Sequence, residues 1–301
     1  MKRTSILIAF VLYAITLKAQ SNNKAMESIL EKVNADRDYF KSLGKSYAAN
    51  NSVAVNAETI AGVNCYYFTP PKFDSNKIII YLHGGSFALG SLEPHRPLVT
   101  HLSADLEAKV LFIDYALAPE KPFPNGLNDI LKVYAEITSK YPGKEISLIG
   151  DSAGGGLAVS FINSAIKDKL PLPERIVLIS PWLYLSCNTD SHKTRKKLEQ
   201  ILTTESLLAY SNYYMGNKWQ AADPSRLTFT TFPPLLILVG SNEILFDDSR
   251  LFYDKIKKVQ PNSTLKEYAG KSHVWLLTDI SSEESKDALN VVKKFLQDKD
   301  N

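Results

Sequence analysis

Residues 146–154 read ISLIGDSAG, an apolar run that ends in a serine flanked by glycines. The run is typical of a strand buried on both faces, and residues 155–166 continue with a helix-like pattern. Ser152 is therefore predicted on a sharp turn between a strand and a helix, where glycines let the backbone crowd past the side chain. The amides that open the helix point to the same place. The pattern favours a serine nucleophile over a phosphate-binding loop, because the lysine of a P-loop is absent.

Four further apolar runs predict more buried strands. They occupy residues 78–82, 110–113, 176–179 and 235–239. Helical patterns lie between the runs, near residues 97–107, 126–139, 153–167 and 247–259. Strands that alternate with helices predict an α/β fold with a mostly parallel sheet and helices on both faces.

Two segments depart from this alternation. Residues 24–43 carry apolar side chains at helical spacing, which predicts an amphipathic helix near the N-terminus. Residues 183–230 hold a charged run followed by an aromatic helical segment. We interpret this second segment as a cap inserted into the α/β core.

The composition is that of a globular protein, with 301 residues of which 45% are hydrophobic and 22% charged. Disorder, collagen and coiled coil are thereby excluded. The formal net charge of +3 is too weakly basic to indicate a nucleic-acid partner. Two cysteines, Cys65 and Cys187, are too few for a disulfide scaffold or a four-thiolate zinc site, and we expect both to be free buried thiols.

Residues 1–19 have the pattern of a secretory signal peptide. Lys2 and Arg3 precede an apolar run over residues 6–17, and a small residue, Ala19, stands at its end. The run is shorter than the ~20 residues of a membrane span. Cleavage after Ala19 would bring the formal net charge from +3 to zero. We expect a secreted or periplasmic protein without stable membrane insertion after cleavage; an N-terminal membrane anchor or a buried helix is the alternative.

The loop after the predicted strand at 78–82 reads His83-Gly84-Gly85-Ser86. Acyl transfer needs N–H donors aimed at the oxyanion that develops on the substrate, and glycines let bare backbone amides come close. We predict that the amides of Gly84, Gly85 and Ala153 are these donors. His83 itself is interpreted as a brace for the loop.

A serine nucleophile needs a base, and the base needs a carboxylate that fixes its tautomer. In α/β-hydrolases the order along the chain is nucleophile, acid, histidine, and among the five histidines His273 fits that order. The acid should follow the strand at 235–239, where Glu243, Asp247 and Asp248 all qualify. We predict Glu243, because the chain leaves the carboxyl edge of the sheet there. Asp247 and Asp248 suit the first turn of the next helix and remain the alternatives.

Several motifs together resemble the hormone-sensitive lipase family of bacterial esterases. They are His83-Gly84-Gly85 with Gly90-Ser91, DYALAPE at 114–120, GDSAGG at 150–155 and Ser180-Pro181-Trp182. The resemblance covers residues 60–300 and implies an α/β-hydrolase core at 61–301, with a helical cap formed by residues 20–60 and 183–230. It also implies hydrolysis of short-chain carboxylic esters without a metal or cofactor.

Three positions depart from the family pattern. Ser86 stands at a frequent glycine, Ala116 stands at a common arginine, and Glu243 stands at the usual aspartate. A small residue such as Ser86 should leave the oxyanion hole intact. Any ion pair made by the arginine is lost at Ala116.

These observations predict a serine carboxylesterase in which Ser152 forms an acyl-enzyme with the help of His273 and Glu243. An amidase or peptidase with the same triad is one alternative, and a non-catalytic ligand-binding protein on a hydrolase fold is another. A small-molecule ester is the expected partner. The sequence indicates neither the natural ester nor the oligomeric state.

Overall fold

The structure is a computed structural model that describes residues 24–297. The predicted signal peptide at residues 1–19 lies outside this range and stays a prediction. Within residues 24–297, no helix combines the length and the apolar character that crossing a bilayer requires.

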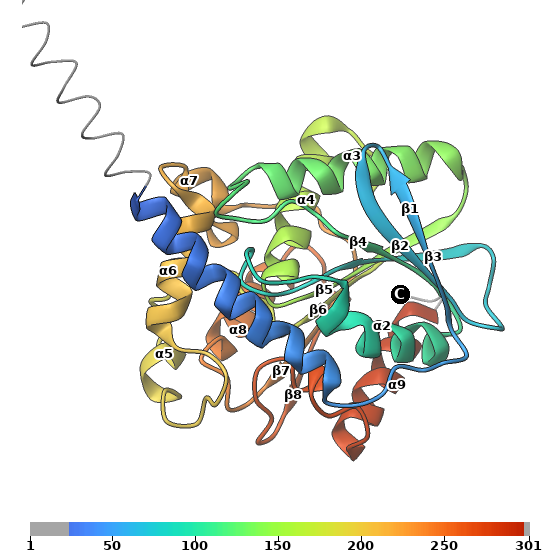
Figure 1. The fold of residues 1–301 in the computed structure, drawn as a ribbon. Coiled ribbons are helices and arrows are strands. Elements are labelled where there is room, and N and C mark those ends of the chain that lie inside the picture. Colours follow the sequence, from blue (N-terminus) through green and yellow to red (C-terminus); the bar gives the residue numbers. More distant parts are fainter. Residues whose placement is uncertain (1–23, 298–301) are drawn as a thin grey trace, which may run out of the picture.

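An eight-stranded sheet forms the centre of the molecule, in the order β1-β2-β4-β3-β5-β6-β7-β8 (Figure 1). From β4 to β8 in this order the neighbours pair in parallel, whereas β1 pairs with β2 and β2 pairs with β4 antiparallel. The prediction of a mostly parallel sheet is therefore confirmed. The strands are β1 (Ala54–Ile60), β2 (Val63–Thr69), β3 (Lys77–Leu82), β4 (Lys109–Ile113), β5 (Glu145–Asp151), β6 (Ile176–Ile179), β7 (Leu235–Gly240) and β8 (Thr264–Tyr268).

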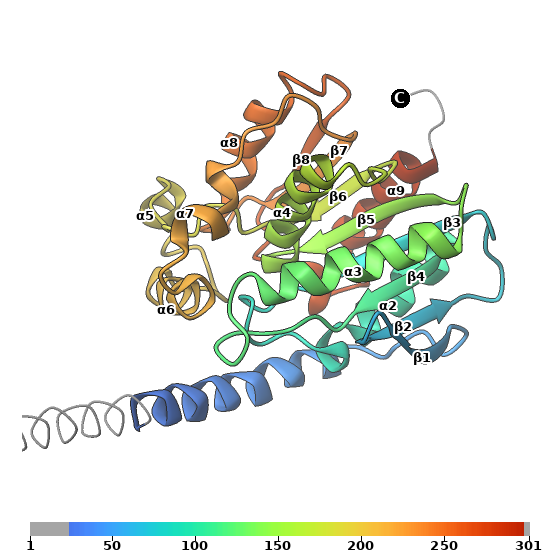
Figure 2. The same cartoon turned by 90° about the horizontal axis from the view of Figure 1, so that it is seen from above.

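Helices cover both faces of the sheet (Figure 2). Side chains of α3, α4 and α8 pack on one face, and side chains of α2 and α9 pack on the other. In β3, Ile80 and Leu82 face the first layer while Ile79 and Tyr81 face the second, which explains why the central strands are apolar at successive positions. The helices are α2 (Leu92–Leu106), α3 (Asn125–Lys140), α4 (Ala153–Asp168), α8 (Phe246–Ile256) and α9 (Glu283–Gln297), with the short η3 (Trp275–Leu277) before α9.

The hairpin of β1 and β2 adds an edge that the sequence patterns did not predict in full. The run at residues 65–68 marks β2, but β1 lacks a comparable apolar run and its side chains are mostly exposed. Ala61 and Gly62 make the turn, both with positive φ. Since one strand at a sheet edge needs few buried side chains, its sequence carries little hydrophobic signal.

The cap insertion, residues 183–230, connects β6 to β7 and contains only short helices. These are α5 (Ser191–Thr194), α6 (Thr204–Met215), α7 (Trp219–Ala222) and η2 (Pro224–Arg226). The helix over residues 24–42, followed by η1 (Leu43–Lys45), is called the N-terminal helix below; it is the long blue helix of Figure 1 and runs past α6. Both segments gather at the same side of the sheet.

Candidate active site

Ser152 occupies the turn between β5 and α4 in a strained conformation, with φ 50° and ψ −121°. Its glycine neighbours are required by close packing. A Cβ on Gly154 would lie 2.0 Å from the carbonyl oxygen of Leu82, and one on Gly150 would lie 2.7 Å from the carbonyl oxygen of Gly154. The turn therefore holds the Ser152 hydroxyl in one direction, at the carboxyl edge of the sheet.

The structure brings Ser152, His273 and Glu243 together in one hydrogen-bonded chain. The Oγ of Ser152 lies 2.9 Å from Nε2 of His273, and Nδ1 of His273 lies 3.0 Å from Oε2 of Glu243. All three side chains are buried. With Nδ1–H donating to the carboxylate, Nε2 is left to accept the serine proton, which is the tautomer a general base needs.

Two donors hold the other oxygen of Glu243. The Ser180 hydroxyl lies 2.7 Å from Oε1, and the amide of Gly240 lies 2.5 Å from it. Ser180 Oγ also accepts a hydrogen bond from the amide of Val274, at 3.1 Å. Ser180 therefore links the carboxylate to the backbone beside His273. The sequence motif Ser180-Pro181-Trp182 marked this residue without revealing its contact.

The charges of this buried pair favour proton uptake by the imidazole. Burial lowers the pKa of His273, but the hydrogen bond and the negative charge of Glu243 together raise it by more, so it stands above the ordinary 6.5. Burial raises the pKa of Glu243, against the donors on its oxygens, which favour the carboxylate form. The imidazole can thus take a proton from Ser152 and share the resulting charge with Glu243.

Asp247 and Asp248 lie on α8 and contact the cap insertion. Asp248 is buried and accepts hydrogen bonds from the amides of Leu183 and Tyr184, at 3.0 and 2.8 Å. Burial raises the pKa of Asp248 to about 7. Asp247 accepts from the amide of Ser191 at 2.7 Å. Both carboxylates therefore anchor the start of the cap insertion, and the carboxylate next to His273 is that of Glu243.

One predicted oxyanion donor is already committed within the protein. The amide of Gly84 donates to Oδ1 of Asp151 at 2.9 Å, so the prediction that it serves the substrate is wrong. Among residues 24–297, no backbone acceptor is recorded for the amides of Gly85, Ser86 or Ala153. The sequence did not predict a donor role for the Ser86 amide, because only glycines were expected to bring bare amides close to the substrate. Ser86 nevertheless has a positive φ of 53° in this loop.

Comparison with known proteins gives one consistent result. The sequence matches the family model described as alpha/beta hydrolase fold over residues 79–277. It is 36% identical over 231 residues to an acetyl-hydrolase of Streptomyces hygroscopicus, which covers 75% of this chain and 77% of that protein. It is 31% identical over 268 residues to an esterase of Acinetobacter venetianus, with coverages of 87% and 88%. The chain belongs to the carboxylic ester hydrolases of the α/β-hydrolase superfamily.

A solved structure agrees with this assignment. The crystal structure of an esterase from the bacterial hormone-sensitive lipase family has a TM-score of 0.85 and 28% sequence identity, and the match covers 88% of this chain and 91% of that one. This esterase is therefore a hormone-sensitive lipase-like carboxylesterase with an α/β-hydrolase fold.

Asp151, which precedes Ser152, holds the loop after β3 beside the Ser152 turn. Oδ1 of this buried carboxylate accepts from Gly84 and, at 2.8 Å, from the hydroxyl of Tyr81. His83 lies nearby with Nδ1 donating to the carbonyl of Gly84 at 2.8 Å, and burial lowers its pKa to about 3. His83 is therefore neutral and braces the loop.

Aromatic side chains fill the space between the nucleophile helix and the cap insertion. Phe87 stacks on Tyr214 of α6 with ring centroids 3.9 Å apart, and Trp182 lies 5.4 Å from Phe87. A Cβ on Gly156, in the first turn of α4, would lie 2.6 Å from the carbonyl oxygen of Trp182 and 3.4 Å from Phe87. This cluster therefore packs against the first turn of α4, which follows Ser152.

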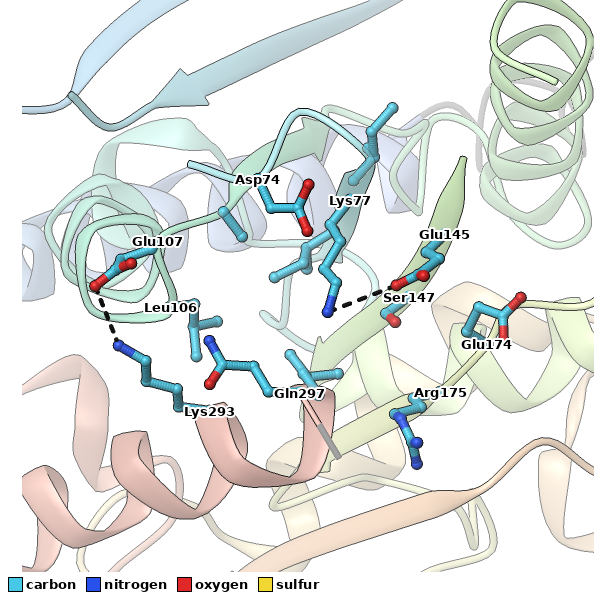
Figure 3. Close-up of a pocket in the computed structure, with 14 residues that line it drawn as sticks. Asp74, Lys77, Leu106, Glu107, Glu145, Ser147, Glu174, Arg175, Lys293 and Gln297 are labelled. Atoms are coloured by element: carbon cyan, nitrogen blue, oxygen red, sulfur yellow. Dashed lines mark hydrogen bonds and ion pairs between the residues drawn. The ribbon is translucent and has the colours of Figure 1, made fainter. Parts of the chain in front are cut away.

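A cavity of about 450 Å³ lies at the opposite edge of the sheet, far from the reactive groups (Figure 3). It is bordered by the starts of β3 and β5 and by the ends of α2 and α9. Lys77 pairs with Glu145 at 3.5 Å, and Lys293 pairs with Glu107 at 3.4 Å. No histidine or cysteine is among the described residues that line it. The cavity thus has a serine, Ser147, but lacks the histidine base of a serine esterase. Nor does the described range 24–297 hold a cluster of three or more His, Cys, Asp or Glu side chains placed to bind a metal ion.

Proposed function

We propose that the esterase uses Ser152 as nucleophile, His273 as general base and acid, and Glu243 as the carboxylate that orients His273. The supporting observation is the continuous hydrogen-bonded chain from Ser152 through His273 to Glu243. Attack by Oγ on the ester carbonyl forms the tetrahedral intermediate while Nε2 takes the serine proton. His273 then gives that proton to the leaving alcohol, and the acyl group remains on Ser152.

The same groups clear the acyl-enzyme. His273 takes a proton from a water molecule, whose oxygen attacks the acyl carbonyl, and returns the proton to Ser152 when the C–O bond breaks. The products are the carboxylic acid and the alcohol, so each bond and proton is accounted for.

The oxyanion of both intermediates requires donors that are free and fixed. We assign this role to the amides of Gly85, Ser86 and Ala153. Ala153 follows Ser152 directly, and the loop that holds Gly85 and Ser86 passes close to Ser152, because a Cβ on Gly84 would lie 3.0 Å from the Cβ of Ser152. The lack of a backbone acceptor for these amides within residues 24–297 also supports the assignment. The amide of Gly84 supports these donors indirectly, by holding the loop to Asp151.

A fluorophosphonate probe tests the nucleophile. Wild-type protein should be labelled once per chain and lose esterase activity, and Ser152→Ala should be neither labelled nor active. Ser160→Ala is the matched control, because Ser160 is also a buried serine of α4 and should label as wild type. Labelling that persists in Ser152→Ala would refute the assignment.

We also propose that the esterase prefers short acyl chains. The aromatic cluster of Phe87, Trp182 and Tyr214 supports this, because bulky side chains close the site beyond a few carbons. Helices α6 and α7 of the cap insertion have four aromatic residues, Tyr210, Tyr213, Tyr214 and Trp219. Tyr210 hydrogen-bonds Asp36 and packs on Tyr213, and Trp219 is 46% exposed, whereas Tyr214 stacks on Phe87 of the loop after β3. The relative from Streptomyces hygroscopicus is named an acetyl-hydrolase, which agrees with a short acyl group.

A chain-length series of aryl esters tests this preference. Activity should peak between acetyl and about hexanoyl esters, since each buried CH₂ contributes ~0.8 kcal/mol only while the site has room for it. Tyr214→Ala should move the optimum to longer chains, whereas Trp219→Ala should leave it unchanged. A steady rise of kcat/KM to long-chain esters in the wild type would contradict the proposal.

Finally, we propose that the esterase is exported and acts as a secreted or periplasmic enzyme. The basic pair Lys2-Arg3 and the apolar run at 6–17 support this. In the native host the mature N-terminus should lie near Gln20, as N-terminal sequencing would show. Soluble cytoplasmic protein that retains Met1 would refute export.

A further inference from the structure

Arg37 of the N-terminal helix contacts the loop that carries the proposed oxyanion donors, residues 83–90, called the oxyanion loop here. Its Nε donates to the carbonyl of Ala88 at 2.8 Å, and Nη2 donates to the carbonyl of Ala118 at 3.2 Å. Nη1 and Nη2 bind the two oxygens of Glu120 at 2.7 and 2.9 Å. Nη1 also donates to Oδ1 of Asn34 at 3.1 Å. Each N–H of the guanidinium thus has an acceptor, and the side chain is only 19% exposed.

The oxyanion loop needs such an outside anchor. Gly85, Ser86 and Phe87 have φ values of 103°, 53° and 60°, and two of these residues carry a Cβ that disfavours positive φ. Few hydrogen bonds inside the loop oppose a return of these residues to ordinary φ values. The amides of Ala88 and Leu89 donate to the carbonyl of Gly85, at 2.9 and 2.7 Å.

The two carbonyls held by Arg37 belong to the segments that close the loop. Ala88 donates to Gly85 through its amide and accepts from Arg37 through its carbonyl. Ala118 donates to the carbonyl of Phe87 at 2.9 Å and also accepts from Arg37. One guanidinium therefore holds the carboxyl end of the strained stretch, at Ala88 directly and at Phe87 through Ala118, while Asp151 holds its amino end at Gly84.

Glu120 fixes the guanidinium in turn. It belongs to the segment 114–120, in which Ala116 carries no charge. Its partner comes instead from a residue 83 positions earlier, on the N-terminal helix. A bidentate arginine–carboxylate pair sets the plane of the guanidinium, so the direction of Nε toward Ala88 is set as well.

We propose that Arg37 is a positioning residue for ester hydrolysis, which holds the oxyanion loop in the conformation that aims the amides of Gly85 and Ser86 at the developing oxyanion. This inference rests on the proposed function of those amides. Arg37 touches neither the substrate nor the reacting atoms. Its loss should therefore weaken binding of the tetrahedral transition state and leave binding of the ground-state ester nearly unchanged.

The test compares Arg37→Met and Arg37→Lys with wild type in kcat, KM and the inhibition constant of phenylboronic acid, whose tetrahedral serine adduct resembles the intermediate. Arg37→Met should lower kcat about tenfold, less than the 10²–10³-fold that removal of a donor itself costs. The inhibition constant should rise by a similar factor, and KM should change less than about twofold. Arg37→Lys should fall between wild type and Arg37→Met, because one ammonium cannot reach all of these acceptors.

Lys41→Met is the matched control, because Lys41 lies on the same helix and, within residues 24–297, forms an ion pair only with the exposed Asp38. It should match wild type in all three quantities. Thermal melting identifies any variant that is unfolded at the assay temperature, and Arg37→Lys carries the test if Arg37→Met fails to fold. The inference is overturned if folded Arg37 variants keep kcat, or if kcat falls while the affinity for phenylboronic acid does not. If wild type itself fails to bind phenylboronic acid, the proposed serine mechanism fails instead.

Discussion

The ionisable groups at the two edges of the sheet differ in their exposure to water. At the carboxyl edge, Glu243, His273 and Asp151 are buried, and each makes hydrogen bonds inside the protein. At the amino edge, Lys77 and Glu145 form an ion pair with side chains 23% and 48% exposed (Figure 3). Water screens the second pair and not the first, so only the carboxyl edge can hold a base with a shifted pKa.

The backbone conformation also differs between the two edges of the sheet. Five of the nine non-glycine residues with positive φ within residues 24–297 lie at the carboxyl edge, namely Ser86, Phe87, Ser152, Ser180 and Val274. Each carries an amide or side chain of the site or contacts one. Strain of this kind persists only where surrounding contacts determine the conformation. The cavity at the amino edge has one such residue, Glu107, which is the left-handed C-cap of α2, but no histidine, so cavity volume alone does not identify a reactive site.

The largest effect that would test this contrast is expected for Glu243→Gln. The amide keeps the shape of the side chain but removes the charge that supports His273, so kcat should fall about 10³–10⁴-fold. Steady-state kinetics with an aryl acetate measures the change. Asp247→Asn is the control, and it should act mainly on stability because Asp247 holds the amide of Ser191. A near-normal kcat in Glu243→Gln together with a collapse in Asp247→Asn would make Asp247 the acid.

A smaller effect is expected for Ser180→Ala. This change removes a hydrogen bond to a charged group, worth about 1.5–3 kcal/mol, so kcat should fall about tenfold to a hundredfold. Ser249→Ala is a matched control, because Ser249 is a buried serine whose hydroxyl has no hydrogen-bond partner within the described range 24–297. Equal kinetics in the two variants would show that Ser180 does not support Glu243.

The next prediction concerns the pH profile, in which the acid midpoint of kcat/KM should shift. The base must be neutral, so activity is lost as the pH falls through the pKa of His273, and the acid midpoint of kcat/KM should lie above 6.5. In Glu243→Gln the influence of the carboxylate is gone and burial remains, so the midpoint should move below 6.5. An unchanged midpoint would mean that Glu243 does not raise the pKa of His273.

The smallest effect is expected at the amino edge. Lys77→Met removes the partly exposed pair with Glu145, and we expect less than about 1 kcal/mol of lost stability and less than about twofold change in kcat/KM. Denaturant unfolding and the aryl acetate assay measure both. A tenfold loss of activity would mean that the two edges are coupled through the sheet.

Local sequence patterns predicted the scaffold, because the residues that define each strand or turn are neighbours in the sequence. Continuous apolar runs mark the strands from β3 to β7, and the glycines around Ser152 mark a turn in which a Cβ would clash. β1 escaped prediction because most of its side chains are exposed.

Contacts between distant residues could not be predicted in the same way. Gly84 was predicted as an oxyanion donor because nothing near it in sequence shows that Asp151, 67 positions later, binds its amide. The bond between Ser180 and Glu243 spans 63 positions, and the one between Arg37 and Glu120 spans 83. Such contacts follow from the fold, and a single sequence does not contain their geometry.

The position of the N-terminal helix in the chain sets the order in which the contacts of the active site can form. This helix precedes its partners in the chain, because those of Arg37 come at Ala88, Ala118 and Glu120. The neighbouring Asp36 meets Tyr210, which is 174 positions later. The partners of Arg37 all precede Ser152, so a growing chain that contains the Ser152 turn can already hold its oxyanion loop. That chain still lacks Glu243 and His273, so ester hydrolysis should begin only when synthesis is nearly complete.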